Sequence, residues 1–126
     1  MQEYEYLMIS TTAEMVRLRE EHVVCITSDG NYSHICVVGG ENFIVSYQLG
    51  HIEQLIGEQL RSSCGNFIRI GRGLIINTRY LCYISISRQN LFLIDASGRK
   101  YVQKASREAL VQLKNVMDKG NEDGEI

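Results

Sequence analysis

The basic side chains of this chain are gathered in one stretch. Residues 61–107 contain nine Lys/Arg and a single acid, Asp95, which gives a local charge of +8. The remainder carries four Lys/Arg and fourteen Asp/Glu, so the net charge of the whole chain is only −2. The basic residues of the stretch are Arg61, Arg69, Arg72, Arg79, Arg88, Arg99, Lys100, Lys104 and Arg107. Because electrostatic attraction depends on local charge, this pattern favours a polyanionic partner.

The other reactive side chains indicate no catalytic or metal centre. The four cysteines are scattered, without a Cys-x-x-Cys pair, at positions 25, 36, 64 and 82. Reduced thiols fit them best, while a disulfide or a zinc site stays open. The three histidines lack ligand spacing, and the sequence has no Gly-x-Ser-x-Gly, P-loop or His-Glu-x-x-His motif. We predict no enzyme activity, no cofactor and no metal.

The length and composition indicate one domain. The chain has 126 residues, of which 44% are hydrophobic, enough for a core of its own. We expect the domain to span residues 1–119 and the polar, acidic residues 120–126 to form a disordered tail. No apolar run reaches the length of a membrane span, about 20 residues, and the acidic N-terminus is unlike a signal peptide. We therefore predict a cytoplasmic protein that does not contact a membrane.

The elements that position the basic residues are mostly short strands. Runs of β-branched and alternating apolar residues are separated by turn residues such as Asp29-Gly30-Asn31 and Gly39-Gly40. This pattern predicts strands over residues 4–10, 14–18, 22–27, 32–38, 42–47, 67–70, 74–76, 80–86, 91–94 and 100–103. The fold class is therefore predicted to be mainly β.

Two segments change to helical spacing. Leu49, Ile52 and Ile56 recur with the period of a helix, and Gly57 is a suitable stop. Near the C-terminus, Ser106 is a suitable N-cap for a helix that ends near Lys119. The sequence thus predicts one or two small helices beside the strands.

Three segments of the chain, taken in their order along the sequence, resemble those of a known protein family. Residues 22–32 read His-Val-Val-Cys-Ile-Thr-Ser-Asp-Gly-Asn-Tyr. Residues 67–77 read Phe-Ile-Arg-Ile-Gly-Arg-Gly-Leu-Ile-Ile-Asn, and residues 105–107 read Ala-Ser-Arg. In order and spacing, the chain resembles the LytTR DNA-binding domain of bacterial transcription regulators. The resemblance implies an elongated fold of short antiparallel sheets, and sequence-specific binding of double-stranded DNA by loops that enter the major groove.

Carried over position by position, the resemblance also implies site residues. The base-reading candidates are Asn31, Ser33, Arg72 and Arg107. The candidates for contact with the DNA backbone are Tyr32, Arg69, Gly71, Gly73, Lys100, Lys104 and Ser106. Arg72 is the strongest, because a guanidinium can bond both O6 and N7 of guanine. Purely structural roles stay open for these residues. Arg72 could be a solvated turn residue, Asn31 and Tyr32 could serve the geometry of their turn, and Arg107 could be an ordinary charge on a helix surface.

Two positions depart from the family pattern. Gly71 stands where many members have His, and Gly73 stands where most have Ser. Glycine on both sides of Arg72 raises the backbone entropy of the free turn. Either Arg72 becomes ordered on contact with DNA, or the turn has lost part of its affinity. The surrounding basic residues favour the first interpretation.

The resemblance also implies partners. We expect a homodimer on repeated half-sites, with the receiver domain or sensor kinase that controls such regulators supplied elsewhere. The alternative is a protein-interaction or dimerisation module of the same fold with weakened DNA binding, in which an edge strand such as residues 4–10 pairs with a partner. Binding to RNA or single strands ranks third, because the tyrosines lie mostly in predicted strands.

Overall fold

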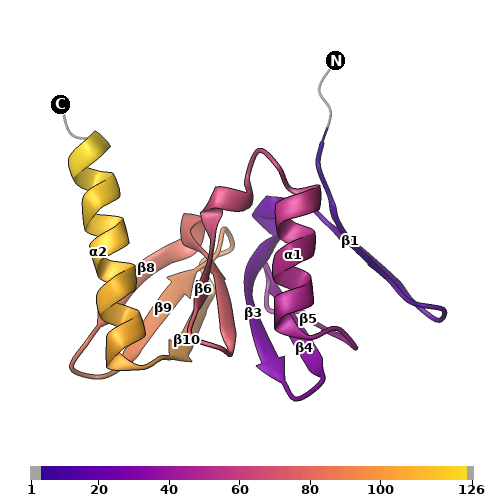
Figure 1. Cartoon of the computed structure of the whole chain (residues 1–126), viewed down its shortest axis with the longest axis horizontal. Helices are drawn as coiled ribbons and strands as arrows, with labels where there is room; N and C mark the ends of the chain where they lie inside the picture. The colour runs from indigo at the N-terminus through magenta and orange to yellow at the C-terminus, as the bar shows by residue number, and fades with distance from the viewer. Residues whose placement is uncertain (1–3, 125–126) are drawn as a thin grey trace.

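The strands form three antiparallel sheets that lie side by side (Figure 1). The computed structural model describes residues 4–124. A two-stranded sheet pairs β1 (Leu7–Ser10) with β2 (Met15–Leu18). The central sheet has the order β5-β4-β3-β7-β6, and the third has the order β10-β9-β8. Their strands are β3 (Val23–Asp29), β4 (Tyr32–Val37), β5 (Asn42–Val45), β6 (Phe67–Ile70), β7 (Leu74–Asn77), β8 (Leu81–Ser85), β9 (Asn90–Ile94) and β10 (Lys100–Lys104).

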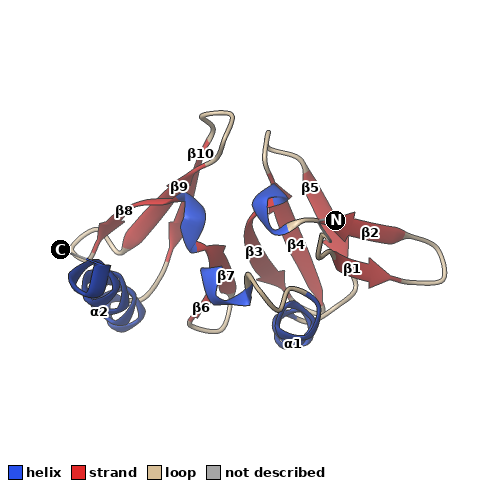
Figure 2. Cartoon of the chain, turned by 90° about the horizontal axis from the view of Figure 1, so that it is seen from above, coloured by secondary structure: helices blue, strands red, loops and turns tan. Residues whose placement is uncertain are grey.

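The two α-helices lie on the same side of the row of sheets (Figure 2). Helix α1 (Leu49–Gln59) follows β5, and helix α2 (Arg107–Gly124) follows β10. Three short 3-10 helices, at Glu20–His22, Cys64–Asn66 and Thr78–Tyr80, complete the elements of the described range. The fold is mainly β with two helices, which confirms the fold class predicted from the sequence.

The central sheet has a hydrophobic core on each of its faces. On one face, Ile75 of β7 packs in a core with Ile52 and Ile56 of α1. On the other face, Leu74 and Ile76 pack in a core that also contains Leu110 and Leu113 of α2. A strand that is buried on both sides has no polar face, and this explains the unbroken apolar run of β7. The sheet therefore joins both helices to one scaffold.

The helices run further than the sequence predicted. Helix α1 continues past Gly57 to Gln59, because Ile56 and Leu60 are buried in the first core and packing outweighs the low helix propensity of glycine. Helix α2 continues to Gly124, whereas the sequence predicted an end near Lys119. Residues 125–126 lie outside the described residues, so the disordered tail over residues 120–126 stays a prediction.

Four turns lie along one edge of the molecule, the lower edge in Figure 1. They are residues 29–32 between β3 and β4, 71–73 between β6 and β7, 86–89 between β8 and β9, and 104–107 between β10 and α2. We call these four segments the turn rim. Both ends of the described chain lie at the opposite, upper edge. The antiparallel order of the strands thus brings segments from the whole chain to one edge.

Candidate nucleic-acid interface

Four cationic side chains of the turn rim form no hydrogen bond or ion pair within the described residues. They are Arg72, Arg88, Lys104 and Arg107, and all four residues are exposed. Most other cations are engaged: Arg79 bonds Glu20, Lys114 bonds Asp118, and Arg19 bonds Glu21. Off the rim, Arg99 and Lys119 are also without such a partner, and Arg17 and Lys100 lie only over aromatic rings. The unpaired positive charge of the basic stretch is therefore concentrated on the turn rim.

A groove of 380 Å³ lies between the turn at 71–73 and the junction of β10 with α2. Arg72 borders it on one side and Lys104 on the other. A more open hollow of 510 Å³ lies between the turn at 86–89 and the same junction, bordered by Arg88 and Lys104. Both hollows share Lys104, Ala105 and Ser106. Arg72, Lys104 and Arg88 thus border two adjacent hollows on either side of this junction, where anionic phosphates could bind.

The turn that carries Arg72 is held by two hydrogen bonds to its backbone. The carbonyl of Gly73 accepts a bond of 2.9 Å from the amide of Ser28 in β3. The carbonyl of Arg72 accepts a bond of 3.0 Å from Nη2 of Arg69. Gly71 has φ +61°, in the left-handed region that glycine adopts without strain. Glycine at position 71 therefore suits the backbone of this turn.

The start of α2 presents the positive end of a helix dipole at the turn rim. Ser106 Oγ accepts a hydrogen bond of 3.2 Å from the amide of Ala109, which confirms Ser106 as the N-cap. Arg107 is the first residue of the helix and is exposed. Free amide groups at a helix N-terminus favour anions, so the dipole adds to the field of the Arg107 guanidinium.

Acidic residues near the turn rim are few. Asp29 ends β3, and its carboxylate pairs with Nε2 of His34 at 3.0 Å. Glu108 follows Arg107 in the first turn of α2. Asp95, the single acid of the basic stretch, is 5% exposed and lies in the turn between β9 and β10, at the other end of β9. The field at the rim is therefore dominated by the cations.

Three of the candidates named from the sequence are not available on the rim. Ser33 is fully buried, and its hydroxyl donates a hydrogen bond of 2.7 Å to the carbonyl of Tyr47. Arg69 is engaged by Glu53 and by the Arg72 carbonyl. Lys100 begins β10 at the end away from the rim, with its ammonium 4.2 Å above the Phe92 ring.

The two remaining candidates lie in the turn between β3 and β4. Asn31 is exposed, and its side-chain oxygen accepts a hydrogen bond of 3.2 Å from Gln48, the residue before α1. Tyr32 is 52% exposed and borders a separate hollow with Ile44. The structure thus places Arg72, Lys104, Ser106 and the glycines together, and places Asn31 and Tyr32 in the neighbouring turn.

Arg88 is the rim cation that the family segments did not indicate. It lies between the second and third matching segments, so no family position pointed to it. Pairing of β9 with β10 places Asn90 opposite Lys104, and this register brings the Arg88 turn beside the end of β10. Hairpin register, which the alternation of the two strands partly encodes, is the signal that could have found it.

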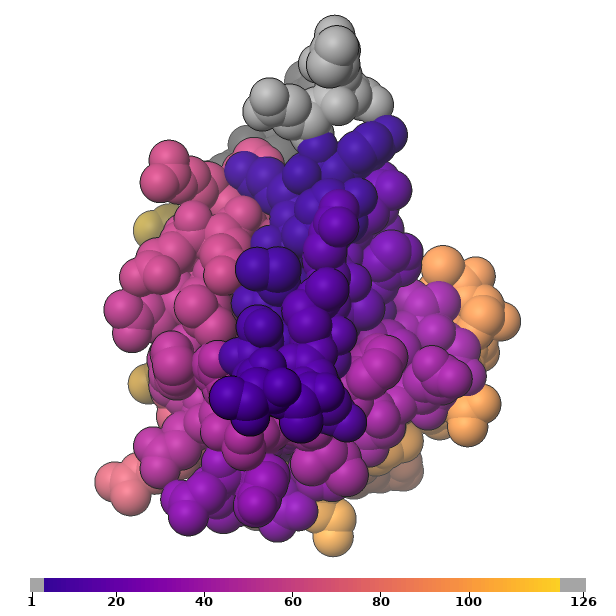
Figure 3. Space-filling model, turned by 90° about the vertical axis from the view of Figure 1, so that its right-hand side faces the viewer, coloured from indigo at the N-terminus to yellow at the C-terminus, as the bar shows by residue number. Residues whose placement is uncertain are grey.

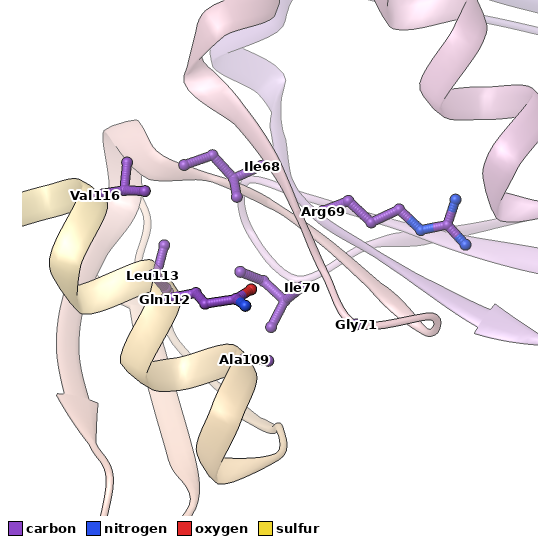
Figure 4. A pocket seen from close by; sticks show the side chains of 8 residues that line it. All are labelled: Ile68, Arg69, Ile70, Gly71, Ala109, Gln112, Leu113 and Val116. Atoms are coloured by element: carbon purple, nitrogen blue, oxygen red, sulfur yellow. The ribbon is translucent and has the colours of Figure 1, made fainter.

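A further hollow, of 140 Å³, lies between β6 and α2 (Figure 4). Its lining is mostly apolar, with Ile68, Ile70 and Leu113 around it. The Arg69 side chain extends from β6 away from this hollow, toward α1 (Figure 4).

The described residues contain no group of three or more His, Cys, Asp or Glu that could hold a metal ion. None of the described helices is both long and apolar enough to cross a membrane.

Comparison with known proteins shows a likeness in structure and none in sequence. No family model matches the chain, and no curated protein sequence matches it. Among solved structures, the chain is similar to the LytTr DNA-binding domain of a Bacillus cereus protein described as a methyl-accepting/DNA response regulator. The TM-score is 0.62 at 15% sequence identity, over 90% of this chain and 96% of that one. The expected resemblance is thus confirmed for the backbone: this chain has the fold of a LytTr DNA-binding domain.

Proposed function

We propose that this chain binds double-stranded DNA in a sequence-specific manner, as the DNA-contacting part of a bacterial transcription regulator. The observation that carries the proposal is the concentration of four unpaired cationic side chains on the turn rim. The likeness to a solved LytTr DNA-binding domain supports the same class of partner. A rim of turns, rather than a single helix, would then contact the duplex.

Within this proposal the four cations have two kinds of role. Arg72 and Arg107 enter the major groove, where a guanidinium can bond two acceptors of one guanine. Lys104 borders the groove beside Arg72, and Arg88 borders the adjacent hollow. Both contact phosphates, which fixes the position of the domain without reading sequence. The small residues Gly71 and Gly73 allow the backbone of the turn to approach the duplex closely.

The regulator acts as a pair of domains on repeated half-sites in this proposal. A receiver domain or a sensor kinase, supplied elsewhere, would control it. Two domains on one duplex bind more tightly than one, because the second contact becomes intramolecular.

The proposal is tested by selecting bound fragments from random-sequence duplex DNA and titrating the binding of the tightest duplex with salt. Each phosphate neutralised adds about −0.9 to the slope of log K against log [salt], so contacts from Arg88 and Lys104 alone give about −1.8. Arg88→Ala should make the slope shallower. Arg99→Ala is the matched control, because the Arg99 side chain is exposed and has no hydrogen-bonding partner but lies off the rim. A flat salt response would contradict the proposal.

A second candidate function is dimerisation through the face that carries the β1–β2 hairpin (Figure 3). Apolar side chains are exposed there: Met15 of β2 is 55% exposed and Ile44 of β5 is 57% exposed. A hollow of 170 Å³ separates the hairpin from β5. A second copy of the chain could cover this apolar surface, whether or not the chain binds DNA. Sedimentation of the intact protein tests this: Met15→Glu and Ile44→Glu should dissociate a dimer, and a monomeric unaltered protein would exclude it.

A further inference from the structure

One guanidinium connects helix α1 to the turn that carries Arg72. Arg69 of β6 donates from Nη1 to Oε1 of Glu53 in α1 at 3.0 Å. The same side chain donates from Nη2 to the carbonyl of Arg72 at 3.0 Å. Figure 4 shows the side chain extending from β6 away from α2 and toward α1. The planar fork of arginine makes both bonds at once, which a lysine ammonium on its flexible stem does less well.

The bond to Arg72 acts on the turn of the rim in which glycine stands on both sides of an arginine. Arg72 has glycine on both sides, so its free backbone has many conformations to lose on binding. Arg69 holds the carbonyl of Arg72, and Ser28 holds the carbonyl of Gly73. The peptide groups on both sides of Gly73 are thus fixed, while the Arg72 guanidinium stays free for a ligand.

The ion pair with Glu53 makes Arg69 a poor phosphate ligand. The Arg69 side chain is only 29% exposed, and Glu53 offsets its charge. Its Nε atom is buried without a partner in the described structure, so the head group is packed rather than solvated. An arginine held in this way would have to break two hydrogen bonds before its side chain could move out toward DNA.

We propose that Arg69, oriented by Glu53, is a positioning residue that sets the Arg72 turn for base recognition and does not itself contact the phosphate backbone. The proposal rests on the proposed function, and it assigns Arg69 a role different from the phosphate contact expected from the sequence. Without the Arg69 hydrogen bond the turn would adopt its binding conformation for a smaller fraction of the time, and the apparent affinity for DNA would decrease in proportion to that fraction.

Substitution of Glu53 separates the two roles by the sign of the effect. Glu53→Ala removes a negative charge and frees Arg69. If Arg69 contacts phosphate, this variant should therefore bind both the cognate and the scrambled duplex more tightly than the unaltered protein does. A positioning role predicts the reverse for the cognate duplex, with affinity lowered about tenfold if the turn is correctly formed one-tenth as often. Glu53→Gln keeps an oxygen acceptor for Arg69 and should retain most of the preference. Glu58→Ala, on the same helix but bonded to Gln54, is the matched control.

The experiment uses the tightest duplex selected from random-sequence DNA, a scrambled duplex of the same length, and amide hydrogen exchange of residues 71–73. For Glu53→Ala we expect weaker binding to the cognate duplex and faster amide exchange in the turn. Binding to the scrambled duplex and the salt dependence of binding should be unchanged, and the temperature of thermal unfolding should match that of Glu58→Ala. Unchanged cognate preference, or tighter binding to both duplexes, would overturn the positioning role alone. If the unaltered protein prefers no duplex, the proposed function is wrong and this inference with it.

Discussion

The carboxylate of Asp95 accepts a hydrogen bond of 2.9 Å from the backbone amide of Gly39, 56 residues earlier in the chain. Asp95 follows β9 in the third sheet, and Gly39 lies in the turn between β4 and β5 of the central sheet. The Tyr101 hydroxyl donates to the same carboxylate oxygen at 2.7 Å. The other oxygen accepts bonds from Ser97 and from the amide of Arg99. One buried carboxylate thus ties two sheets together, at the end of β9 that lies away from the turn rim.

Asp95→Asn should lower the free energy of unfolding, and the loss should depend on pH. Burial opposes ionisation of Asp95, but bonds from Ser97, Gly39 and Tyr101 together outweigh it and hold its pKa below the ordinary value. Each donor left unsatisfied costs about 1–3 kcal/mol. Because the folded pKa is depressed, the ionised group stabilises the fold above the unfolded pKa of about 3.9. Denaturation of both proteins from pH 7 to pH 2 should show the difference shrinking below about pH 4. A pH-independent difference would contradict this role.

Arg72→Ala should reduce discrimination between selected and scrambled duplex. A bidentate contact to guanine contributes about 1–3 kcal/mol of discrimination, so the preference should fall roughly 5- to 150-fold. Thermal stability should change little, because the Arg72 side chain is exposed and outside both cores. Competition binding with both duplexes measures this. An unchanged preference for the selected duplex would show that Arg72 does not read a base. Arg61→Ala, in the segment between α1 and β6, controls for the loss of one positive charge.

Lys104→Ala should weaken selected and scrambled duplex by the same factor. An ammonium on a phosphate contributes affinity without sequence information, and its loss should make the salt slope shallower by about 0.9. Lys100→Ala is the matched control, because Lys100 lies on the same strand at the end away from the rim. Salt titrations of the three proteins on both duplexes give the slopes. A loss restricted to the selected duplex would instead assign Lys104 to base recognition.

The two glycines beside Arg72 should respond to alanine in opposite directions. A Cβ added at Gly73 would meet no heavy atom within 4 Å, and φ there is not positive, so Gly73→Ala should stabilise by about 0.4–1 kcal/mol through lower entropy of the free chain. Gly71 has φ +61°, where a side chain costs about 1–2 kcal/mol. Chemical denaturation measures both. Equal effects on stability at the two positions would contradict the geometry of this turn.

The strand pattern of the sequence predicts most of the fold, whereas the DNA-contact candidates were implied by the resemblance and stay predictions. All ten strands follow from alternation and turn residues, which are local properties of the chain. Burial of Ser33 follows from the same alternation, because Ser33, Ile35 and Val37 are successive residues on one face of β4. The bonds of Arg69 to Glu53 and of Asp95 to Gly39 join residues 16 and 56 positions apart. No local pattern encodes such contacts, so a charged residue assigned to a partner by position alone can belong to the scaffold.

The separation of the turn rim from the two cores has an evolutionary consequence. Replacing an exposed side chain in these turns leaves the packed interior intact, so mutations that retarget the protein need not endanger its folding. Descendants of one ancestral scaffold could therefore diverge toward unrelated operators while their backbones stay superimposable.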